Sequence, residues 1–131
     1  YMPQDSSEVL DYATTPVKFL KSAYDKEKLT RALSCLGPMK FTRDEMNHSI
    51  GELSGGQKAK LIYLNMVFQK ANGWILDEPT LNFSPLSAPV IRKSLTDFKG
   101  TIISISHDRK YLDETADLIY ELTADGLKPL F

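Results

Sequence analysis

Apolar residues in the first half of the chain recur three and four positions apart, which is the spacing of one face of an α-helix. Residues 6–36 follow this pattern. Pro16 is placed to begin a second helix inside the segment, because proline is tolerated at the first helical position. Gly37 and Pro38 end the region. The pattern therefore predicts helices throughout residues 6–36.

Two later segments carry helix-start signals. Residues 42–45 (Thr-Arg-Asp-Glu) fit a capping box, in which the threonine and glutamate side chains satisfy free backbone N–H groups reciprocally. Residues 54–57 (Ser-Gly-Gly-Gln) have the same form, so a long helix is predicted to begin near Ser54. Its apolar face continues until Asn72 and Gly73 stop it.

The period of the pattern changes after Gly73. Residues 74–76 are a short continuous apolar run that ends in two acids, as buried parallel strands do. Residues 101–105 form a second strand, rich in β-branched side chains, and residues 87–98 between the two are helical in pattern. The order strand, helix, strand predicts parallel pairing with a right-handed crossover.

The end of the chain adds a short helix capped by Asp108 and a further strand at residues 118–120. The whole pattern predicts an α/β fold. We expect one domain in two portions, a largely helical region in residues 1–72 and a parallel β/α portion in residues 73–131.

Composition narrows the class of protein. The 131 residues amount to one domain, and the apolar share of 42% and charged share of 25% are ordinary for a soluble globular protein. A net charge of −1 predicts no general affinity for nucleic acid. The single cysteine, Cys35, excludes a disulfide framework and suits a cytoplasmic protein. No apolar run reaches the ~18 residues that span a bilayer, so no direct membrane insertion is expected.

Two acids stand where open α/β sheets bind ligands, directly after the first predicted strand. Asp77 suits a water-mediated hold on Mg²⁺, which prefers hard oxygen ligands. Glu78 is placed to orient or deprotonate a water molecule that attacks a phosphate. The alternative is a strand end followed by a polar turn, with Asp77 as a cap.

His107 follows the second predicted strand, and the parallel arrangement puts it at the same edge as the two acids. A histidine there is suited to donate a hydrogen bond to a phosphate and to an attacking water. The alternative is a histidine that bonds only to nearby backbone.

The glycines after Ser54 leave backbone N–H groups uncovered at a helix start, where the helix dipole also favours an anion. The Ser54 hydroxyl and the Gln57 amide are candidates to reach the same ligand. The usual phosphate loop requires a Gly-Lys pair, and the chain contains none. The glycine turn is therefore either a plain capping box or half of a shared phosphate site.

Together these stretches resemble the nucleotide-binding domain of ATP-binding-cassette (ABC) proteins. The family's motifs occur in the family's order: Leu-Ser-Gly-Gly-Gln at 53–57, Leu-Asp-Glu-Pro-Thr at 76–80 and Ser-His-Asp at 106–108. Tyr-Met-Pro-Gln at 1–4 then resembles the family's Q-loop. The resemblance covers nearly the whole chain and implies a partial P-loop NTPase fold without its phosphate-loop portion. The chain is accordingly interpreted as a fragment of a longer polypeptide.

The resemblance also implies that the site residues serve two different ATP molecules. In this family two domains dock head to tail, and each ATP lies between one domain's phosphate loop and the partner's Leu-Ser-Gly-Gly-Gln. The residues expected to contact ATP held by a second domain are Ser54, Gly55, Gly56 and Gln57. The residues expected to serve this domain's own ATP are Gln4 and Asp77, toward Mg²⁺, and Glu78 and His107, in catalysis. The parent protein is expected to hydrolyse ATP, and the fragment alone to be inactive and to bind neither ATP nor Mg²⁺ tightly.

Finer details resemble the ABC-F branch, soluble two-domain proteins that act on ribosomes. Ser-His-Asp-Arg-Lys-Tyr-Leu at 106–112 fits that branch, and Asn-Phe-Ser-Pro-Leu-Ser at 82–87 resembles the second domain of its antibiotic-resistance, ribosome-protection group. Ser84 stands where the branch has the aspartate of its D-loop, so the coupling of the two sites through that loop is in doubt.

The alternative is the ATPase subunit of a membrane transporter, whose helical region would dock on a permease. The helical region here carries a run of charged residues: Lys21, Asp25, Lys26, Glu27 and Lys28. That run is either a solvated helical face or a contact surface for ribosomal RNA or protein.

Overall fold

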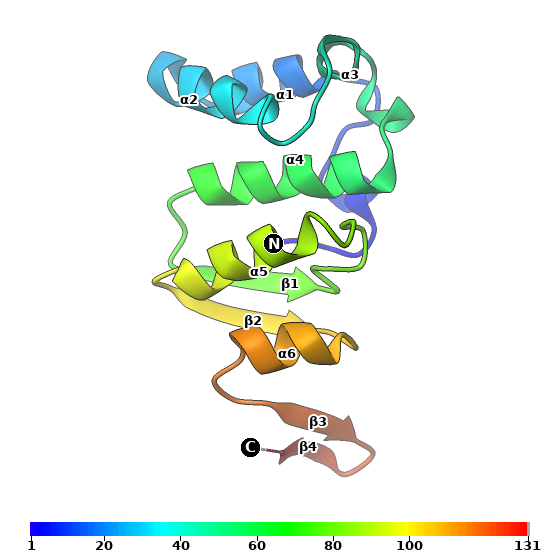
Figure 1. Ribbon diagram of the computed structural model, residues 1–131, viewed down its shortest axis with the longest axis vertical. Helices are drawn as coiled ribbons and strands as arrows, with labels where there is room; N and C mark the ends of the chain where they lie inside the picture. Colours follow the sequence, from blue (N-terminus) through cyan, green and yellow to red (C-terminus); the bar gives the residue numbers. More distant parts are fainter. Residues whose placement is uncertain (131) are drawn as a thin grey trace.

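The computed structural model describes residues 1–130 and stacks a helical part on a small sheet (Figure 1). In chain order the elements are α1 (Pro16–Ala23), α2 (Lys26–Leu36), α3 (Arg43–Asn47), α4 (Gly55–Phe68), β1 (Gly73–Asp77), α5 (Ala88–Asp97), β2 (Thr101–Ile105), α6 (Arg109–Thr115), β3 (Tyr120–Thr123) and β4 (Gly126–Pro129), with short 3₁₀ turns at Ser6–Glu8 and Ile50–Glu52. The predicted α/β class with parallel strands is confirmed. Within the described residues, no helix combines the length and apolar character needed to cross a bilayer.

The helical region is more broken than the sequence pattern predicts. Residues 6–36 hold one 3₁₀ turn and two separate helices, so the expectation of helix throughout this segment is wrong. Local side chains make the breaks: Thr15 accepts a hydrogen bond from the Lys18 N–H and caps α1, and Asp25 accepts one from the Lys28 N–H and caps α2. Such side-chain bonds compete with helix continuation and favour a new helix start.

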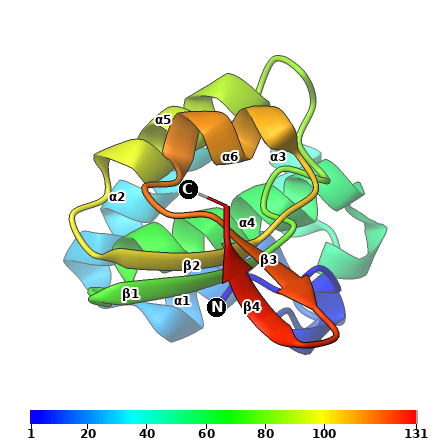
Figure 2. The same cartoon turned by 90° about the horizontal axis from the view of Figure 1, so that it is seen from below.

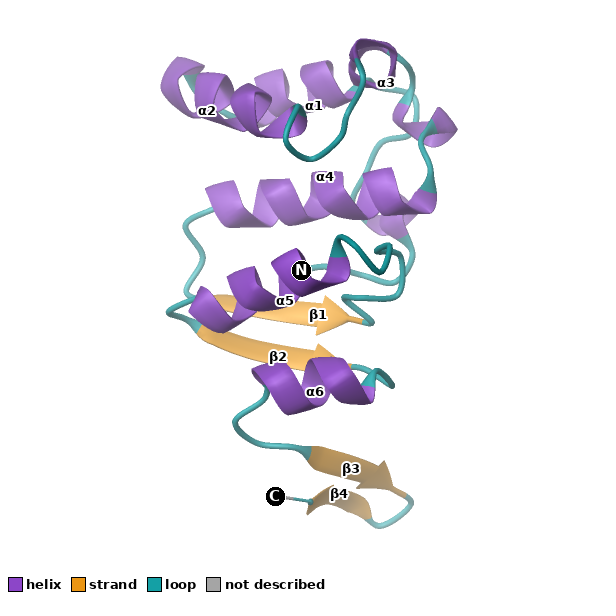
Figure 3. Ribbon diagram, viewed as in Figure 1, coloured by secondary structure: helices purple, strands orange, loops and turns teal. Residues whose placement is uncertain are grey.

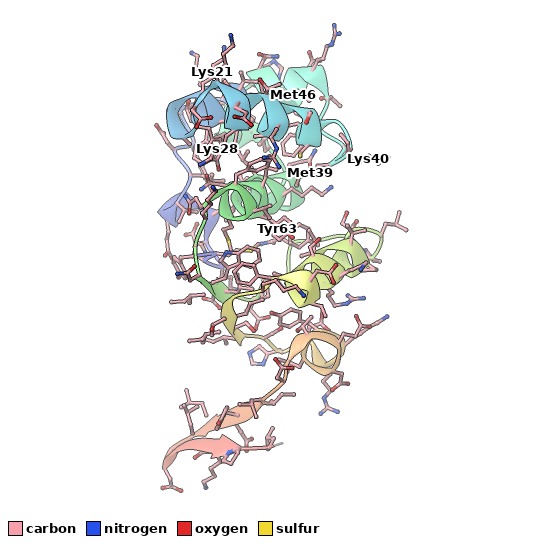
Figure 4. All side chains as sticks on the ribbon, turned by 90° about the vertical axis from the view of Figure 1, so that its left-hand side faces the viewer. Lys21, Lys28, Met39, Lys40, Met46 and Tyr63 are labelled. Atoms are coloured by element: carbon pink, nitrogen blue, oxygen red, sulfur yellow. The ribbon has the colours of Figure 1, made fainter. Side chains whose placement is uncertain are left out.

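The loop between α2 and α3 is attached to α4, and Figure 4 shows Met39 and Lys40 of this loop beside that helix. The predicted capping box of Thr42 and Glu45 is present. Ser54 caps α4, as predicted, by accepting from the Gln57 N–H. The Gln57 side chain does not complete a second box: its amide nitrogen donates to the Lys40 carbonyl and to Glu45 Oε2, both at 3.0 Å.

The two parallel strands β1 and β2 pair in register from Gly73 with Thr101 to Asp77 with Ile105, and α5 connects them. Met2 lies on the free edge of β1, where its N–H donates to the Ile75 carbonyl at 2.8 Å. The first residues of the chain therefore lie against the sheet and not against the helices of the helical region.

One face of β1 and β2 is packed. Trp74 and Leu76 are buried there, and the Trp74 ring stacks on Phe98 at 3.8 Å and meets the edge of Tyr63. Figure 4 shows Tyr63 on the side of α4 that faces the sheet. Figure 2 shows α5 and α6 together on one side of the two strands.

The opposite face is open. Ile75, Ile103 and Ile105 are 57%, 63% and 66% exposed, so within the described residues these strands are less buried than their apolar sequences predict. The apolar run in each strand fits a sheet covered on both faces, but within the described residues only one face is covered.

The C-terminal residues form a separate antiparallel hairpin of β3 and β4 (Figure 3). The strand expected at residues 118–120 starts at Tyr120 and continues to Thr123, and β4 has no counterpart in the prediction. Gly126, with a φ of 112°, supplies the left-handed backbone that ends the turn.

Candidate functional site

The loops after β1 and β2 leave the sheet at the same edge, the one formed by the carboxyl ends of the strands, because the strands are parallel and in register. Asp77 pairs with Ile105, and the Glu78 N–H donates to the Ile105 carbonyl at 2.9 Å. Glu78 and His107 therefore meet at this edge, as the parallel arrangement predicts. We refer to Asp77, Glu78, Ser106 and His107 as the rim.

Glu78 is held firmly at the rim. Its side chain is 13% exposed, and its carboxylate accepts from the His107 N–H at 3.2 Å and lies 3.3 Å from the Ser106 hydroxyl. Its φ is 48°, a left-handed conformation that is uncommon for residues other than glycine. Strained backbone of this kind gathers at functional sites, where the surrounding contacts hold it in place.

The His107 imidazole stands open to solvent beside this carboxylate. Its side chain is 96% exposed, and its Nε2 lies 3.6 Å from Glu78 Oε1. Because the backbone N–H of the same residue bonds to Glu78, the ring is held near the carboxylate while its outer side is free. The Glu78 carboxylate is thus a proton acceptor, and the His107 imidazole beside it is an exposed hydrogen-bond donor.

A second pair of polar residues joins the same two loops. The Thr80 hydroxyl is 2.9 Å from Asp108 Oδ2, and Asp108 also caps α6 by accepting from the Tyr111 N–H at 3.1 Å. The hydrogen bond from the Tyr111 backbone, with that from Thr80, holds the pKa of Asp108 below its ordinary value. Thr80 and Ser106 stand inside the motifs at 76–80 and 106–108, but neither was predicted as a site residue. The available signal is polar residues at alternate positions in both loops.

Gln4 reaches the rim through the N-terminal segment. Met2 is bridged in parallel to Leu76, so Gln4 and Glu78 each lie two residues beyond the paired position. Both residues line a polar cavity of about 320 Å³ whose wall also includes Gly55 of α4. The cavity therefore connects the rim with the start of α4.

The start of α4 forms a second surface. Ser54 and Gly55 are exposed, and the Ser54 hydroxyl accepts from the Gln57 N–H at 3.2 Å. A Cβ on Gly56 would lie 3.0 Å from the Asn82 carbonyl oxygen, so a larger residue here would require the loop after β1 to shift by a few tenths of an ångström. Of the four predicted anion-facing residues, Ser54 and Gly55 lie at the surface. Gly56 is closely approached by the loop, and the Gln57 amide nitrogen is engaged within the domain.

The oxygen-bearing side chains at the rim are too few to hold Mg²⁺ alone, and they suit an ion that a nucleotide also binds. Among residues 1–130, no group of three or more His, Cys, Asp and Glu side chains is placed to hold a metal by itself. Mg²⁺ is commonly held by one or two carboxylates together with substrate phosphates and waters. Asp77, half-buried at the end of β1, would supply one carboxylate to such an ion, and Gln4 would supply an amide oxygen.

Comparison with known sequences places the chain in a family. The family model described as "ABC transporter" matches residues 1–81. The putative ATP-binding protein YdiF of Bacillus subtilis is 33% identical over 98% of this chain, and the probable ATP-binding protein YheS of Escherichia coli is 30% identical over 92%. ABC transporter F family member 2 of Arabidopsis thaliana is 27% identical over 97%. The chain spans 20%, 19% and 19% of the length of these three proteins.

Solved structures agree on the fold. A dimeric ATP-binding cassette, MJ0796, in a post-hydrolysis state bound to ADP and Pi superposes with a TM-score of 0.66 at 19% identity, over 82% of this chain and 52% of that one. A structure titled RNase-L Inhibitor gives a TM-score of 0.65 at 21% identity, over 84% of this chain and 22% of that one. The chain thus has a partial ABC ATPase fold, and it belongs to the ABC transporter family.

Proposed function

We propose that the complete protein carrying this sequence is an ATP hydrolase in which this chain supplies parts of two different ATP sites. The observation that carries the proposal is the separation of two chemistries. The rim places Glu78 and an exposed His107 together. Ser54 and Gly55 are exposed at the start of α4, and Ser54 is not among the residues that line the cavity shared by Glu78 and Gly55.

The rim serves the reaction of one ATP. Glu78 orients and deprotonates the attacking water, and the His107 imidazole donates a hydrogen bond to the γ-phosphate as negative charge develops. Asp77 and Gln4 would hold the Mg²⁺ that accompanies the nucleotide. When bound, the ion neutralises charge on the phosphates.

The start of α4 serves an ATP held by a second cassette domain. The Ser54 hydroxyl and the free N–H groups of the first helical turn favour an anion, and the dipole of this 14-residue helix adds to the attraction. The solved MJ0796 cassettes to which the fold is similar are dimers, which supports a partner domain at this surface.

Replacing the carboxylate by an amide tests the role of Glu78. In the complete protein, Glu78→Gln is expected to lower ATP turnover about a hundredfold or more, because the general base is lost. ATP is expected to remain bound, because the substitution removes no contact to a phosphate. Turnover is measured by phosphate release and binding by retained nucleotide. Glu121→Gln, an exposed glutamate of β3, is the matched control. Unchanged turnover in Glu78→Gln removes this residue from the base role.

We further propose that the complete protein is an ABC-F factor that binds ribosomes. The similarity to proteins named as F family members and the Ser-His-Asp-Arg-Lys-Tyr-Leu stretch support this branch. The resemblance of residues 82–87 to the ribosome-protection group extends the proposal to antibiotic resistance. The competing function is the ATP-binding subunit of a transporter, which the description of the matching family favours.

Co-sedimentation separates the two functions. The complete Glu78→Gln protein is expected to pellet with ribosomes when ATP is present and to stay in the supernatant without nucleotide, because trapped ATP holds the domains closed. A protein that remains in the supernatant under both conditions contradicts the ribosome proposal. Co-purification with a membrane permease would support the transporter function.

A further inference from the structure

We propose that Ser106 is a positioning residue for ATP hydrolysis, acting through its hydrogen bond to the Glu78 carboxylate; this inference rests on the proposed function. Its hydroxyl oxygen lies 3.3 Å from Glu78 Oε2. The hydrogen bonds that its side chain makes within the described residues are with Glu78 and Asp108, both at the ends of β1 and β2, so the effect is expected at the rim and not at the start of α4.

The direction of this hydrogen bond follows from the neighbouring contact. The Asp108 N–H donates to the Ser106 hydroxyl oxygen at 3.1 Å. A serine hydroxyl has a single hydrogen, and an ionised carboxylate only accepts. The Ser106 hydroxyl therefore accepts from Asp108 and donates to Glu78, so its orientation is determined from both sides.

Ser106 is one member of a ring that joins the two loops of the rim. Glu78 and Thr80 come from the loop after β1, and Ser106 and Asp108 from the loop after β2. The cross-links are Ser106 with Glu78, at 3.3 Å, and Thr80 with Asp108, at 2.9 Å. The backbone of each loop closes the ring, so the strained backbone of Glu78 is held by contacts on both sides.

Loss of the Ser106 hydroxyl is expected to leave the fold in place. The paired part of β2 ends at Ile105, the Thr80 contact to Asp108 does not involve Ser106, and Asp108 still caps α6 through the Tyr111 N–H. The carboxylate of Glu78 then retains only its bond from the His107 N–H and rotates more freely. A less well oriented base lowers the rate of the chemical step and not the affinity for ATP.

Steady-state ATPase kinetics of the complete protein test the role. Ser106→Ala is expected to lower kcat about tenfold, as the loss of a hydrogen bond to a charged group does, with the KM for MgATP within about twofold of wild type. Ser106→Thr keeps the hydroxyl and is expected to restore kcat to within about threefold. Ser22→Ala removes an exposed serine hydroxyl from α1 and is the control. An unchanged kcat in Ser106→Ala, a change in KM alone, or a Thr variant as impaired as the Ala variant overturns the proposal.

Hydrogen exchange of the nucleotide-free complete protein separates this inference from the proposed function. Ser106→Ala is expected to accelerate exchange of the His107 and Asp108 amides about tenfold, while amides of β1 stay unchanged. If the wild type hydrolyses no ATP, the proposed function fails, and the positioning of Glu78 is judged on exchange alone. Unchanged exchange of both amides in Ser106→Ala would show that the ring does not orient Glu78. Accelerated exchange would support the ring.

Discussion

At the scale of single residues, the backbone of Glu78 is the most informative feature of the site. Its φ of 48° carries roughly 1–3 kcal/mol of strain. Its side chain is fixed by Ser106 and by the His107 N–H, which over-determine the strained conformation. The protein therefore places a carboxylate at the strand end in a geometry that an unconstrained loop would not keep.

Asp108 makes the stability of the fold depend on pH. Its folded-state pKa lies below its ordinary value, first through the Tyr111 backbone hydrogen bond, so the carboxylate stabilises the fold above the unfolded-state pKa of about 3.9. That stability is lost as the pH falls below about 4 and through the lower folded-state pKa. Asp108→Asn, which still caps a helix, is expected to flatten this acid dependence.

Urea unfolding of the chain, followed by the fluorescence of its single tryptophan, Trp74, measures the effect at a series of pH values. The difference in free energy of unfolding between wild type and Asp108→Asn is expected to narrow from pH 6 toward pH 3. A constant difference across this range would show that Asp108 does not contribute through its charge.

At the scale of elements, α4 is fixed to the helical region through its first turn. The buried Gln57 donates to the Lys40 carbonyl and to Glu45, and Glu45 Oε2 also accepts from the Thr42 N–H at 2.8 Å. Lys40 itself has a φ of 67°, a second left-handed residue beside this contact. The Ser54 surface is thereby held in a defined position relative to α3.

A double-mutant cycle tests this attachment. Gln57→Met and Glu45→Ala are each expected to destabilise the chain by about 1–2 kcal/mol, and the double variant by less than their sum, with a coupling of about 1 kcal/mol. The free energy of unfolding of all four proteins is measured by urea titration. Additive effects would mean that the two side chains do not act together.

The sequence predicted the elements better than the contacts between them. Strand β2 matches residues 101–105, and the caps Thr42, Ser54 and Asp108 begin helices as predicted, since each depends on a few neighbouring residues. The meeting of Glu78 with His107 was also predicted, because parallel pairing follows from the order of strand and helix. The Gln57 contacts were not, since an S-x-x-Q pattern does not specify which distant acceptors the amide meets.

At the scale of the whole molecule, the open face of β1 and β2 is the least expected feature. Its apolar residues are Ile75, Ile103 and Ile105, all more than half exposed. Their hydrophobicity predicts burial, but the apolar character of a strand does not reveal which element covers it. Contiguous exposed apolar surface of this kind favours association.

We expect this face to be covered in the complete protein and to cause self-association of the 131-residue chain alone. The double variant Ile103→Thr, Ile105→Thr keeps β-branched side chains and is expected to reduce association in sedimentation velocity, whereas it should lower the thermal stability of the complete protein. Leu86→Thr, in a loop and 90% exposed, is the control for loss of a single exposed apolar side chain. Equal association of the wild type and the double variant would rule out this face as the cause.

The most direct measurement of the central claim is the structure of the complete Glu78→Gln protein trapped with MgATP. The proposed division of roles predicts that the side chain at position 78 and His107 face the γ-phosphate of one ATP, and that Ser54 contacts a different ATP held by another domain. A single nucleotide in contact with both Ser54 and His107 of the same domain, or a Ser54 surface remote from any phosphate, would contradict it.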